Sequence, residues 1–185
     1  GGGGREGGWA VVARRALGLV PRGRGVGTGG MRKHSLAGGL VTDVIGLEIE
    51  FGDEEACRWE HVMSEQVERR ILELLKHPTE SPYGNPIPGL AELGETGKSQ
   101  AEFLDGVQPL TRAIRGATEP QRVVVRRISE PLQTDTEVMS VLRRVGVLPG
   151  NDVLVSQGHD GVIVARQGET AEIDSESAAH IFVSS

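Results

Sequence analysis

The sequence predicts an α+β protein in which a helical region precedes a small SH3-like β-barrel. Apolar residues recur at helical spacing three times between residues 31 and 77, and short apolar runs typical of strands recur after residue 120. A proline-rich stretch and a polar segment separate these two patterns. With 185 residues, of which 37% are hydrophobic and 3% aromatic, the chain is long enough for one ordinary domain or two small ones.

Composition argues against several classes of protein. The single cysteine, Cys57, cannot form a disulfide framework within one chain and suits a reducing compartment. No apolar run approaches the ~20 residues that span a bilayer, and the N-terminal region lacks the apolar stretch of a secretion signal. The formal charge of −6 gives no basic excess of the kind that favours nucleic acid. We therefore expect a soluble, cytoplasmic protein.

The first 30 residues differ in character from the rest of the chain. They contain 12 of the 27 glycines and five arginines against one glutamate, whereas the other 155 residues carry 15 cationic and 25 acidic side chains. Short apolar runs at 9–12 and 17–20 flank Arg14 and Arg15. This pattern is compatible with a β-hairpin whose turn is basic.

Three helices are expected in the helical region. The first covers 31–45 and is followed by Gly46, and the second covers about 52–63. The third begins after Ser64, a good N-cap, and ends at the proline that follows residue 77. Three short helices cannot bury all their apolar stripes alone, so we expect dimerisation through this region. The residues of these stripes are Leu36, Leu40, Val44, Val67, Ile71 and Leu74.

The remainder divides into an extended segment, a linker and the barrel. Prolines throughout 81–89 predict an extended, polyproline-like segment that could dock on the barrel. Residues 94–119 are polar and are typical of a linker. From residue 120, we expect strands and one helix in a barrel of the SH3 type. The expected strands are 123–125, 153–155, 161–164 and 181–183, and the helix is 136–145.

One constellation in the second helix carries metal-binding chemistry. Cys57, Glu60 and His61 stand at positions i, i+3 and i+4, and Asp53 lies one turn earlier, so a helix places all four side chains on one face. Thiolate, carboxylate and imidazole together suit Fe²⁺, Mn²⁺, Co²⁺ or Ni²⁺ better than an all-sulfur zinc site. The spacing alone leaves open an ordinary acidic helix with a buried cysteine and a solvated histidine.

The sequence supports an enzymatic function less than it supports metal binding. A Cys57–His61 pair could form a reactive thiolate, but nothing nearby resembles a nucleophile elbow or an oxyanion site. The sequence contains no phosphate-binding loop, no HExxH motif and no dinucleotide fingerprint. We therefore expect a protein that is not an enzyme.

Several stretches resemble the diphtheria toxin repressor family of metal-dependent bacterial transcriptional repressors, and its iron-dependent regulators in particular. The most specific are EACRWEHVMS at 55–64 and GNPIPGL at 84–90, and MRKH at 31–34 and VERR at 67–70 support them. The strong resemblance covers residues 31–93, and the barrel is similar at lower stringency.

The resemblance implies four parts. Residues 1–30 correspond to the wing hairpin of a winged-helix DNA-binding domain and 31–93 to the helical metal-binding and dimerisation domain. Residues 94–119 are then a linker, and 120–185 an SH3-like domain of the FeoA kind. On this alignment the chain as written starts near the end of the recognition helix, so we expect its operator binding to be weakened or lost.

The family's metal ligands carry over position by position. Its primary site matches Cys57, Glu60 and His61, and its ancillary site matches His34, Asp53, Glu130 and Gln133. Asp53 stands where the family has a histidine and can still ligate through oxygen. Gly38 stands where the family has a glutamate and offers no ligand. Arg14 and Arg15, at the tip of the wing, are the candidate DNA contacts.

The implied function is an iron- or manganese-dependent repressor that controls metal-uptake genes. The cofactor is then Fe²⁺ or, alternatively, Mn²⁺, with Co²⁺ or Ni²⁺ binding in vitro, and the partners are a second copy of the chain and operator DNA. The alternative is a metal-binding dimerisation or interaction module without sequence-specific DNA binding.

Overall fold

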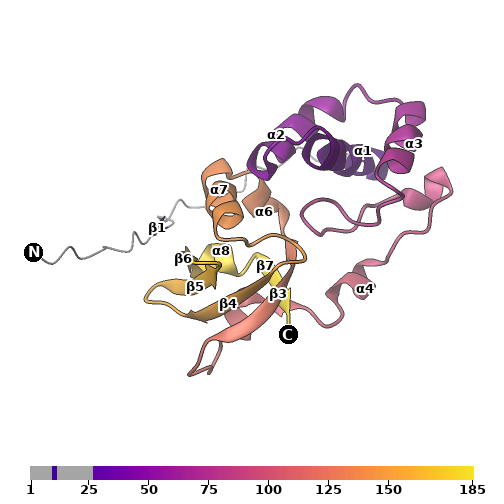
Figure 1. Cartoon of the computed structure of the whole chain (residues 1–185). Helices are drawn as coiled ribbons and strands as arrows, with labels where there is room; N and C mark the ends of the chain where they lie inside the picture. The colour runs from indigo at the N-terminus through magenta and orange to yellow at the C-terminus, as the bar shows by residue number, and fades with distance from the viewer. Residues whose placement is uncertain (1–9, 12–26) are drawn as a thin grey trace, which may run out of the picture.

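The computed structural model describes residues 10–11 and 27–185, and within this part the chain forms a helical lobe and a sheet-containing lobe (Figure 1). The helical lobe contains α1 (Thr28–Gly39), which continues as the π-helix η1 (Leu40–Val44), followed by α2 (Ile49–Trp59) and α3 (Glu65–Leu74). All three expected helices are therefore present, in the expected order.

The helix ends differ in part from the expectation. The first helix begins at Thr28 rather than residue 31, and its last turn widens into the π-helix, which closes with a hydrogen bond from the Ile45 N–H to the Leu40 carbonyl. Gly46, at φ +85°, then breaks the helix as expected. The second helix begins at Ile49, earlier than residue 52, and ends at Trp59. Ser64 caps α3 as expected, since its side chain accepts a hydrogen bond from the Val67 N–H at 3.3 Å.

The three helices bury most of their apolar stripes against one another within a single chain. Leu36 and Ala37 of α1 are fully buried, and Ile71 and Leu72 of α3 join them in the same cluster. We expected the apolar stripes to need a second chain for burial, and this is wrong for Leu36 and Ile71, which are buried within one chain. Val44, Val67 and Leu74 do remain exposed.

The proline segment is not extended. Residues 80–86 fold back on themselves, with a bridge between Glu80 and Pro86 and a hydrogen bond from the Ser81 N–H to the Asn85 carbonyl. Gly84 at φ +79° makes the turn. The expectation of a polyproline-like conformation is wrong because one glycine and one asparagine supply a tight turn between the prolines.

The turn does dock on the sheet-containing lobe, as expected for this segment. Tyr83 is buried in the core of that lobe, and its carbonyl accepts from the Ile128 N–H. The Asn85 amide donates to the Ile128 carbonyl at 2.8 Å. The contact is thus made by a tyrosine and an asparagine in a turn, rather than by a proline helix.

The segment expected to be a linker contains short elements. These are η2 (Leu90–Leu93), α4 (Gln100–Leu104), β2 (Gln108–Pro109) and α5 (Leu110–Ala113). Leu110 and Ile114 are buried in the core of the sheet-containing lobe. The end of the expected linker, from residue 108 onward, therefore contributes to the second lobe, while the domain boundaries themselves stay predictions.

The second lobe is the expected SH3-like sheet. Its main strands are β3 (Gln121–Ile128), β4 (Asp152–Gln157), β5 (Gly161–Arg166), β6 (Glu169–Asp174) and β7 (Ile181–Ser184). With β1 (Ala10–Val11) at one edge, the described sheet runs β1-β6-β5-β4-β3-β7-β2, and all its pairings are antiparallel except that between β1 and β6. Three helices accompany it: α6 (Glu130–Gln133), α7 (Thr136–Arg144) and α8 (Ser175–Ala178).

Of the expected wing hairpin at 1–30, residues 10–11 and 27–30 are described, and 28–30 belong to α1 instead. Ala10–Val11 form β1, which pairs in parallel with Ala171 and Glu172 of β6. The rest of the hairpin, including Arg14 and Arg15, lies outside the described residues.

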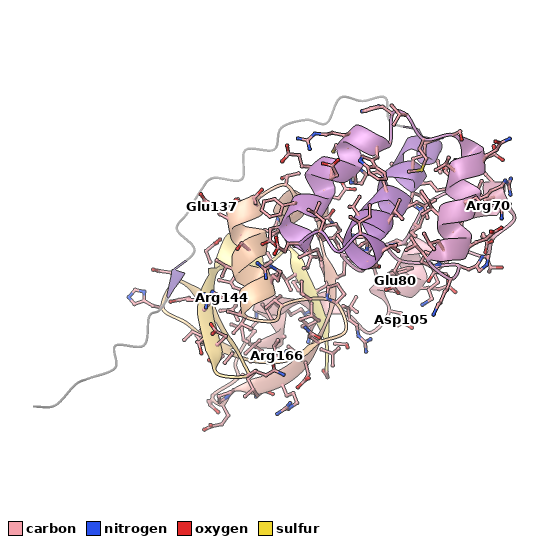
Figure 2. All side chains as sticks on the ribbon, turned by 45° about the horizontal axis from the view of Figure 1, so that its top comes forward. Arg70, Glu80, Asp105, Glu137, Arg144 and Arg166 are labelled. Carbon is pink, nitrogen blue, oxygen red and sulfur yellow. The ribbon has the colours of Figure 1, made fainter. Side chains whose placement is uncertain are left out.

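The two lobes meet where α7 packs against α2 (Figure 1). Figure 2 shows Arg70 at the outer end of the helical lobe and Arg144 and Arg166 on the other lobe. At the junction, the Arg143 guanidinium donates to both carboxylate oxygens of Glu50, at 2.8 to 3.1 Å. The helix that carries Asp53 and Cys57 is therefore fixed to the SH3-like lobe.

Candidate metal centre

Four side chains that can bind metal gather where α1 packs on α2. His34 of α1 lies between two carboxylates: its Nδ1 is 2.6 Å from Glu60 Oε2, and its Nε2 is 3.0 Å from Asp53 Oδ1. Donor atoms of His34, Cys57 and Glu60 all lie within 4.8 Å of one another. The side chains of Asp53, Glu60 and His34 are only 7%, 11% and 15% exposed.

Buried charge networks fix the position of α1. Arg32 is held between Glu68 of α3, with Nε–Oε1 at 2.7 Å, and Glu92, with Nη1–Oε2 at 2.5 Å. The hydrogen bond to fully buried Glu68, and then the second carboxylate, raise the pKa of Arg32 against the opposing effect of its own burial. The neighbouring Lys33 donates to the Met63 carbonyl at 2.6 Å. Arg32 and Lys33 directly precede His34, so these contacts hold the turn of α1 from which His34 projects.

The first turn of α2 is fixed by Tyr83. Its hydroxyl donates to the Ile49 carbonyl at 2.8 Å. A Cβ on Gly52 would lie 3.0 Å from the Tyr83 hydroxyl and 2.8 Å from Thr42, so a glycine allows the close approach. Burial, and then the charge of Asp53, raise the pKa of Tyr83 well above its usual range, which keeps it a neutral donor.

The structure brings some of the expected ligands together and separates others. Cys57 and Glu60 lie together as expected, but His61 points outward with 73% of its side chain exposed, and its Nε2 is 3.6 Å from Glu60 Oε1. His34 and Asp53, expected in a separate ancillary site, lie beside Glu60.

The two expected ligands from the SH3-like lobe are not part of this cluster. Glu130 is exposed, and Gln133 is buried and donates to the Ile128 carbonyl at 2.9 Å. Among the described residues, the only group of three His, Cys, Asp or Glu side chains with metal-binding geometry is His34, Cys57 and Glu60. The assignment of these residues to two sites stays a prediction.

Sequence reasoning missed two residues that support the site. Tyr83 was treated only as part of a proline segment, although the one tyrosine of a chain with 3% aromatic residues is a candidate anchor. Glu50 gave no local signal, because its importance depends on Arg143, 93 positions away.

The donor set fits a divalent transition metal. Ligand distances of about 2.0–2.3 Å place two ligands of one ion at most about 4.6 Å apart, and the donor atoms of His34, Cys57 and Glu60 all lie within 4.8 Å of one another. Imidazole nitrogen, thiolate and carboxylate oxygen together favour Fe²⁺, Mn²⁺ or Co²⁺ over hard cations such as Mg²⁺. Low exposure and ligands from two helices are consistent with a site that links α1 to α2.

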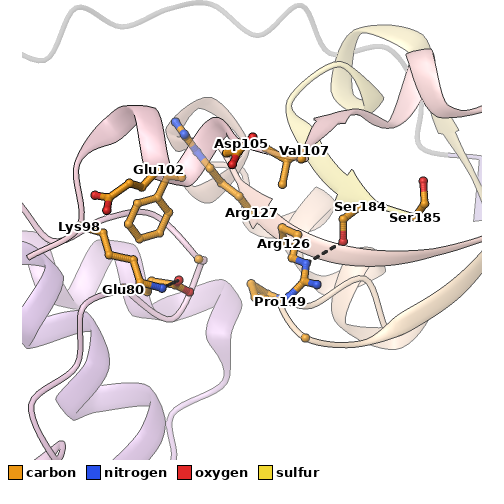
Figure 3. Close-up of a pocket in the computed structure, with 14 residues that line it drawn as sticks. Glu80, Lys98, Glu102, Asp105, Val107, Arg126, Arg127, Pro149, Ser184 and Ser185 are labelled. Carbon is orange, nitrogen blue, oxygen red and sulfur yellow. Dashed lines mark hydrogen bonds and ion pairs between the residues drawn. The ribbon is translucent and has the colours of Figure 1, made fainter.

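A separate hollow of about 570 Å³ lies between the α4 region and the SH3-like lobe (Figure 3). Arg126, Lys98 and Pro149 line it, and Arg126 donates to Ser184 Oγ at 2.8 Å. Acidic side chains line it too, among them Glu80 and Asp105. The mixture of charges does not define one class of ligand, and none of the four clustered metal-binding residues belongs to its lining.

Comparison with known proteins agrees with this picture. Residues 20–89 match the family described as iron dependent repressor, metal binding and dimerisation domain, and residues 113–185 match the FeoA domain. The diphtheria toxin repressor of Corynebacterium diphtheriae is 41% identical over 170 residues, which are 91% of this chain and 73% of that protein. The chain belongs to the diphtheria toxin repressor family.

Other members of the diphtheria toxin repressor family are similarly close. The iron-dependent repressor IdeR of Mycobacterium leprae is 41% identical over 174 residues, which cover 88% of this chain and 74% of the relative. The crystal structure of T. acidophilum IdeR superposes with a TM-score of 0.65 at 27% identity, covering 85% of this chain and 66% of that one. The family resemblance read from the sequence is confirmed.

None of the helices between residues 27 and 185 combines the length and the apolar character that crossing a bilayer requires.

Proposed function

We propose that this chain is a metal-responsive transcriptional repressor that acts as a homodimer, with Fe²⁺ or Mn²⁺ as its effector. The observation that carries the proposal is the group His34, Cys57 and Glu60, which lies within the metal-binding and dimerisation domain match. Co²⁺ or Ni²⁺ would occupy the same donors in vitro. Such a repressor has no enzymatic activity and works in the cytoplasm, where its operator lies.

Names of the relatives support this effector class. Three of the most similar proteins are called iron-dependent repressors or diphtheria toxin repressors, and each covers most of this chain. By family position, Cys57, Glu60 and His61 form the primary site and His34, Asp53, Glu130 and Gln133 the ancillary one. Arg14 and Arg15 would contact DNA phosphates, which position a protein without reading sequence.

The residues of this chain indicate how metal would change the protein. When bound, the metal supplies an attraction between donors on different helices, so it favours the arrangement in which α1 and α2 are correctly packed. Arg32 and Tyr83 hold those helices against α3 and the SH3-like lobe. The donors are therefore largely in place before metal arrives.

Exposed apolar side chains supply a surface for dimerisation. Val44, Ile45 and Phe51 are 49%, 58% and 42% exposed and surround the turn between η1 and α2. Such a concentration at one turn is typical of an interface rather than of an isolated surface. Ile71, by contrast, is 4% exposed and stabilises the single chain.

Metal-dependent DNA binding tests the proposal. Fluorescence anisotropy would compare a palindromic operator with scrambled DNA of equal length, with Mn²⁺ and with chelator. We expect a weakened operator preference that appears only with Mn²⁺ and is absent with Cys57→Ser. Equal affinity for both DNAs under both conditions would contradict the repressor function. Equal affinity would instead favour a metal-binding interaction module. The affinity for the operator in the same assay measures how far operator binding by the chain is weakened.

A further inference from the structure

The hollow between the α4 region and the SH3-like lobe contains two arginines without an acidic partner. Taken together its charges are mixed, but they are divided between the elements that line it. Arg126 and Arg127 come from β3, whereas Glu80 belongs to the proline turn and Glu102 to α4. Figure 3 shows Glu80 and Glu102 across the hollow from Arg126. Within the described part of the chain, no ion pair joins either arginine to a carboxylate.

A β-bulge brings both arginines into the same lining. In the pairing of β3 with β7, Val125 lies opposite Val183 and Arg127 lies opposite Phe182, so Arg126 is an extra residue. Such an extra residue interrupts the alternation of side chains along a strand and changes the direction in which they point. Two adjacent residues of β3 therefore line one hollow, and bulges that redirect side chains are common beside functional sites.

Arg127 has hydrogen-bonding capacity that the described residues do not use. Its Nε and Nη1 are buried, and neither has a hydrogen-bond partner in the described part of the chain. Its Cζ lies 5.4 Å from the centre of the Phe182 ring, so an aromatic contact holds the guanidinium instead. Burial lowers the pKa of Arg127 against the opposing charge of Glu130, but a guanidinium stays protonated at neutral pH. A buried cation whose N–H groups lack acceptors indicates an acceptor from outside the chain.

The acidic side chains of the hollow already have partners of their own. Glu80 Oε1 lies 3.7 Å from Lys98 Nζ, and Glu102 accepts from the Ser99 N–H at 2.6 Å. The hydrogen bonds from Ser99 lower the pKa of Glu102, so this carboxylate is ionised at neutral pH. Each carboxylate has further lone pairs, which accept hydrogen bonds from hydroxyl groups and disfavour a second anion nearby.

We propose that this hollow binds a small polyhydroxylated molecule with one anionic group, either a sugar acid or a sugar phosphate. The carboxylate or phosphate pairs with Arg126 and Arg127, because guanidinium groups bind these oxygens in preference to neutral acceptors. The hydroxyls donate to Glu80 and Glu102. The volume of about 570 Å³ lies within the range of about 300–1,000 Å³ found for small-molecule sites. No hydrogen bond holds Arg127 Nε and Nη1, so the guanidinium is free to turn from Phe182 toward the anion.

Such a ligand would strengthen the contact between the two lobes. The proline turn lies directly on β3, since a Cβ on Gly84 would come within 1.9 Å of the Arg126 carbonyl oxygen. A molecule that contacts Arg126 and Glu80 at once ties this turn to the strand. Tyr83 of the same turn donates to the Ile49 carbonyl at the start of α2. Binding in the hollow therefore stabilises the folded chain. The site uses none of the clustered metal-binding residues and so goes beyond the proposed function.

Isothermal titration calorimetry of the whole chain tests the site with gluconate, glucose 6-phosphate, glucose and citrate. We expect gluconate, glucose 6-phosphate or both to bind with a Kd below about 1 mM, and the stronger of the two identifies the anionic group. Glucose should not bind, because it offers no partner to the arginines. Citrate should bind more weakly, because its additional carboxylates meet Glu80 and Glu102.

Arginine variants test which side chains hold the anion. Arg127→Met keeps the unbranched stem beside Phe182 but removes every N–H group, and should weaken binding at least about tenfold. Arg126→Met should weaken binding too, and serves if Arg127→Met does not fold. The matched control is Arg122→Met, which changes an arginine of the same strand that does not line the hollow and should bind like the wild type.

Thermal unfolding separates binding from a structural role of Arg127. The bound molecule should raise the Tm of the wild type and leave that of Arg127→Met unchanged. Without ligand, Arg127→Met should be at least as stable as the wild type, because it removes a buried cation without acceptors. A clear fall in Tm would assign the guanidinium a structural role and overturn the site.

Three results of the titrations would also overturn the proposal. These are no binding of gluconate or glucose 6-phosphate up to about 10 mM, unchanged binding by both arginine variants, and glucose or citrate binding at least as tightly as the two expected ligands. The proposed function is tested separately, because Cys57→Ser should lose metal-dependent operator binding and keep binding in the hollow.

Discussion

Removing Arg143 should destabilise the junction between the two lobes more than removing any neighbouring surface charge. Its guanidinium makes contacts of 2.8, 2.9 and 3.1 Å with Glu50, whose side chain is 4% exposed. Arg143→Ala leaves this carboxylate buried without its partner. Hydrogen bonds to charged groups contribute about 1.5–3 kcal/mol, and we expect a loss of that size.

Thermal unfolding followed by circular dichroism measures this loss. For a protein of this length, about 2–4 °C of Tm corresponds to each kcal/mol, so Arg143→Ala should lower Tm by roughly 3–12 °C. The matched control is Arg144→Ala, which breaks a pair with Glu169 in which the side chains are 40% and 52% exposed. Exposed pairs contribute about 0–1 kcal/mol, so this variant should unfold within about 4 °C of the wild type.

The effect of pH gives an independent check. Burial raises the pKa of Glu50, but hydrogen bonds from Arg143 and from its own backbone outweigh this, so the net pKa lies below the ordinary 4.5. A group with a depressed pKa contributes stability that is complete above its unfolded value and is lost as pH falls through its folded value. The difference between wild type and Arg143→Ala should therefore be constant near neutrality and shrink as the pH falls toward 4.5 and below, because burial alone raises the pKa of Glu50 in the variant.

Two results would refute the reasoning. Equal Tm shifts for Arg143→Ala and Arg144→Ala would mean that the buried pair is worth no more than a surface pair. A double-mutant cycle with Glu50→Gln that shows no coupling would mean that Arg143 acts through other contacts.

Three further predictions follow from other parts of the molecule. Gly84→Ala places a Cβ at φ +79°, 1.9 Å from the Arg126 carbonyl oxygen, and should lower the free energy of unfolding in urea by about 2 kcal/mol or more. Its control Gly94→Ala has the same φ but open space around the Cβ, and should lower that free energy by about 1 kcal/mol. Phe51→Glu should convert a dimer to monomer in sedimentation without lowering Tm by more than a few degrees, and an unchanged dimer would place the interface elsewhere. Arg14→Ala with Arg15→Ala should reduce the slope of log affinity for DNA against log salt by about 1.8, and an unchanged slope would remove both arginines from the DNA contact.

The elements with local signals could be predicted from the sequence. Ser64 and the apolar stripe that follows it are sufficient to predict α3. Asp135 caps α7 in the same way, because its side chain accepts from the Val138 N–H at 3.0 Å. Strand β6 was missed because Ala171 and Ile173 point inward between polar residues, so it contains no apolar run. Alternation over six residues was its only signal.

The candidate site shows the limit of local patterns more clearly. One helical face correctly joins Cys57 with Glu60, since i and i+3 are neighbours on any helix. The same rule places His61 on this face, but α2 ends at Trp59 and His61 lies beyond it, with its Nε2 3.6 Å from Glu60 Oε1. The approach of His34 depends on how α1 packs on α2, which spacing within one helix cannot show.

The strand order sets a sequence of events during synthesis. Strand β7, made after the other strands, lies between β3 and β2, so an inner position of the sheet stays empty until residue 184 has emerged. Leu110 lies on α5, which packs against β7, so its core site is incomplete until β7 has been made. Helices α1 to α3 have their shared core much earlier, while Ile128, whose N–H donates to the Tyr83 carbonyl, is made later. Newly made chains should therefore acquire protected amides in two steps, with those of α3 first and those of β3 last.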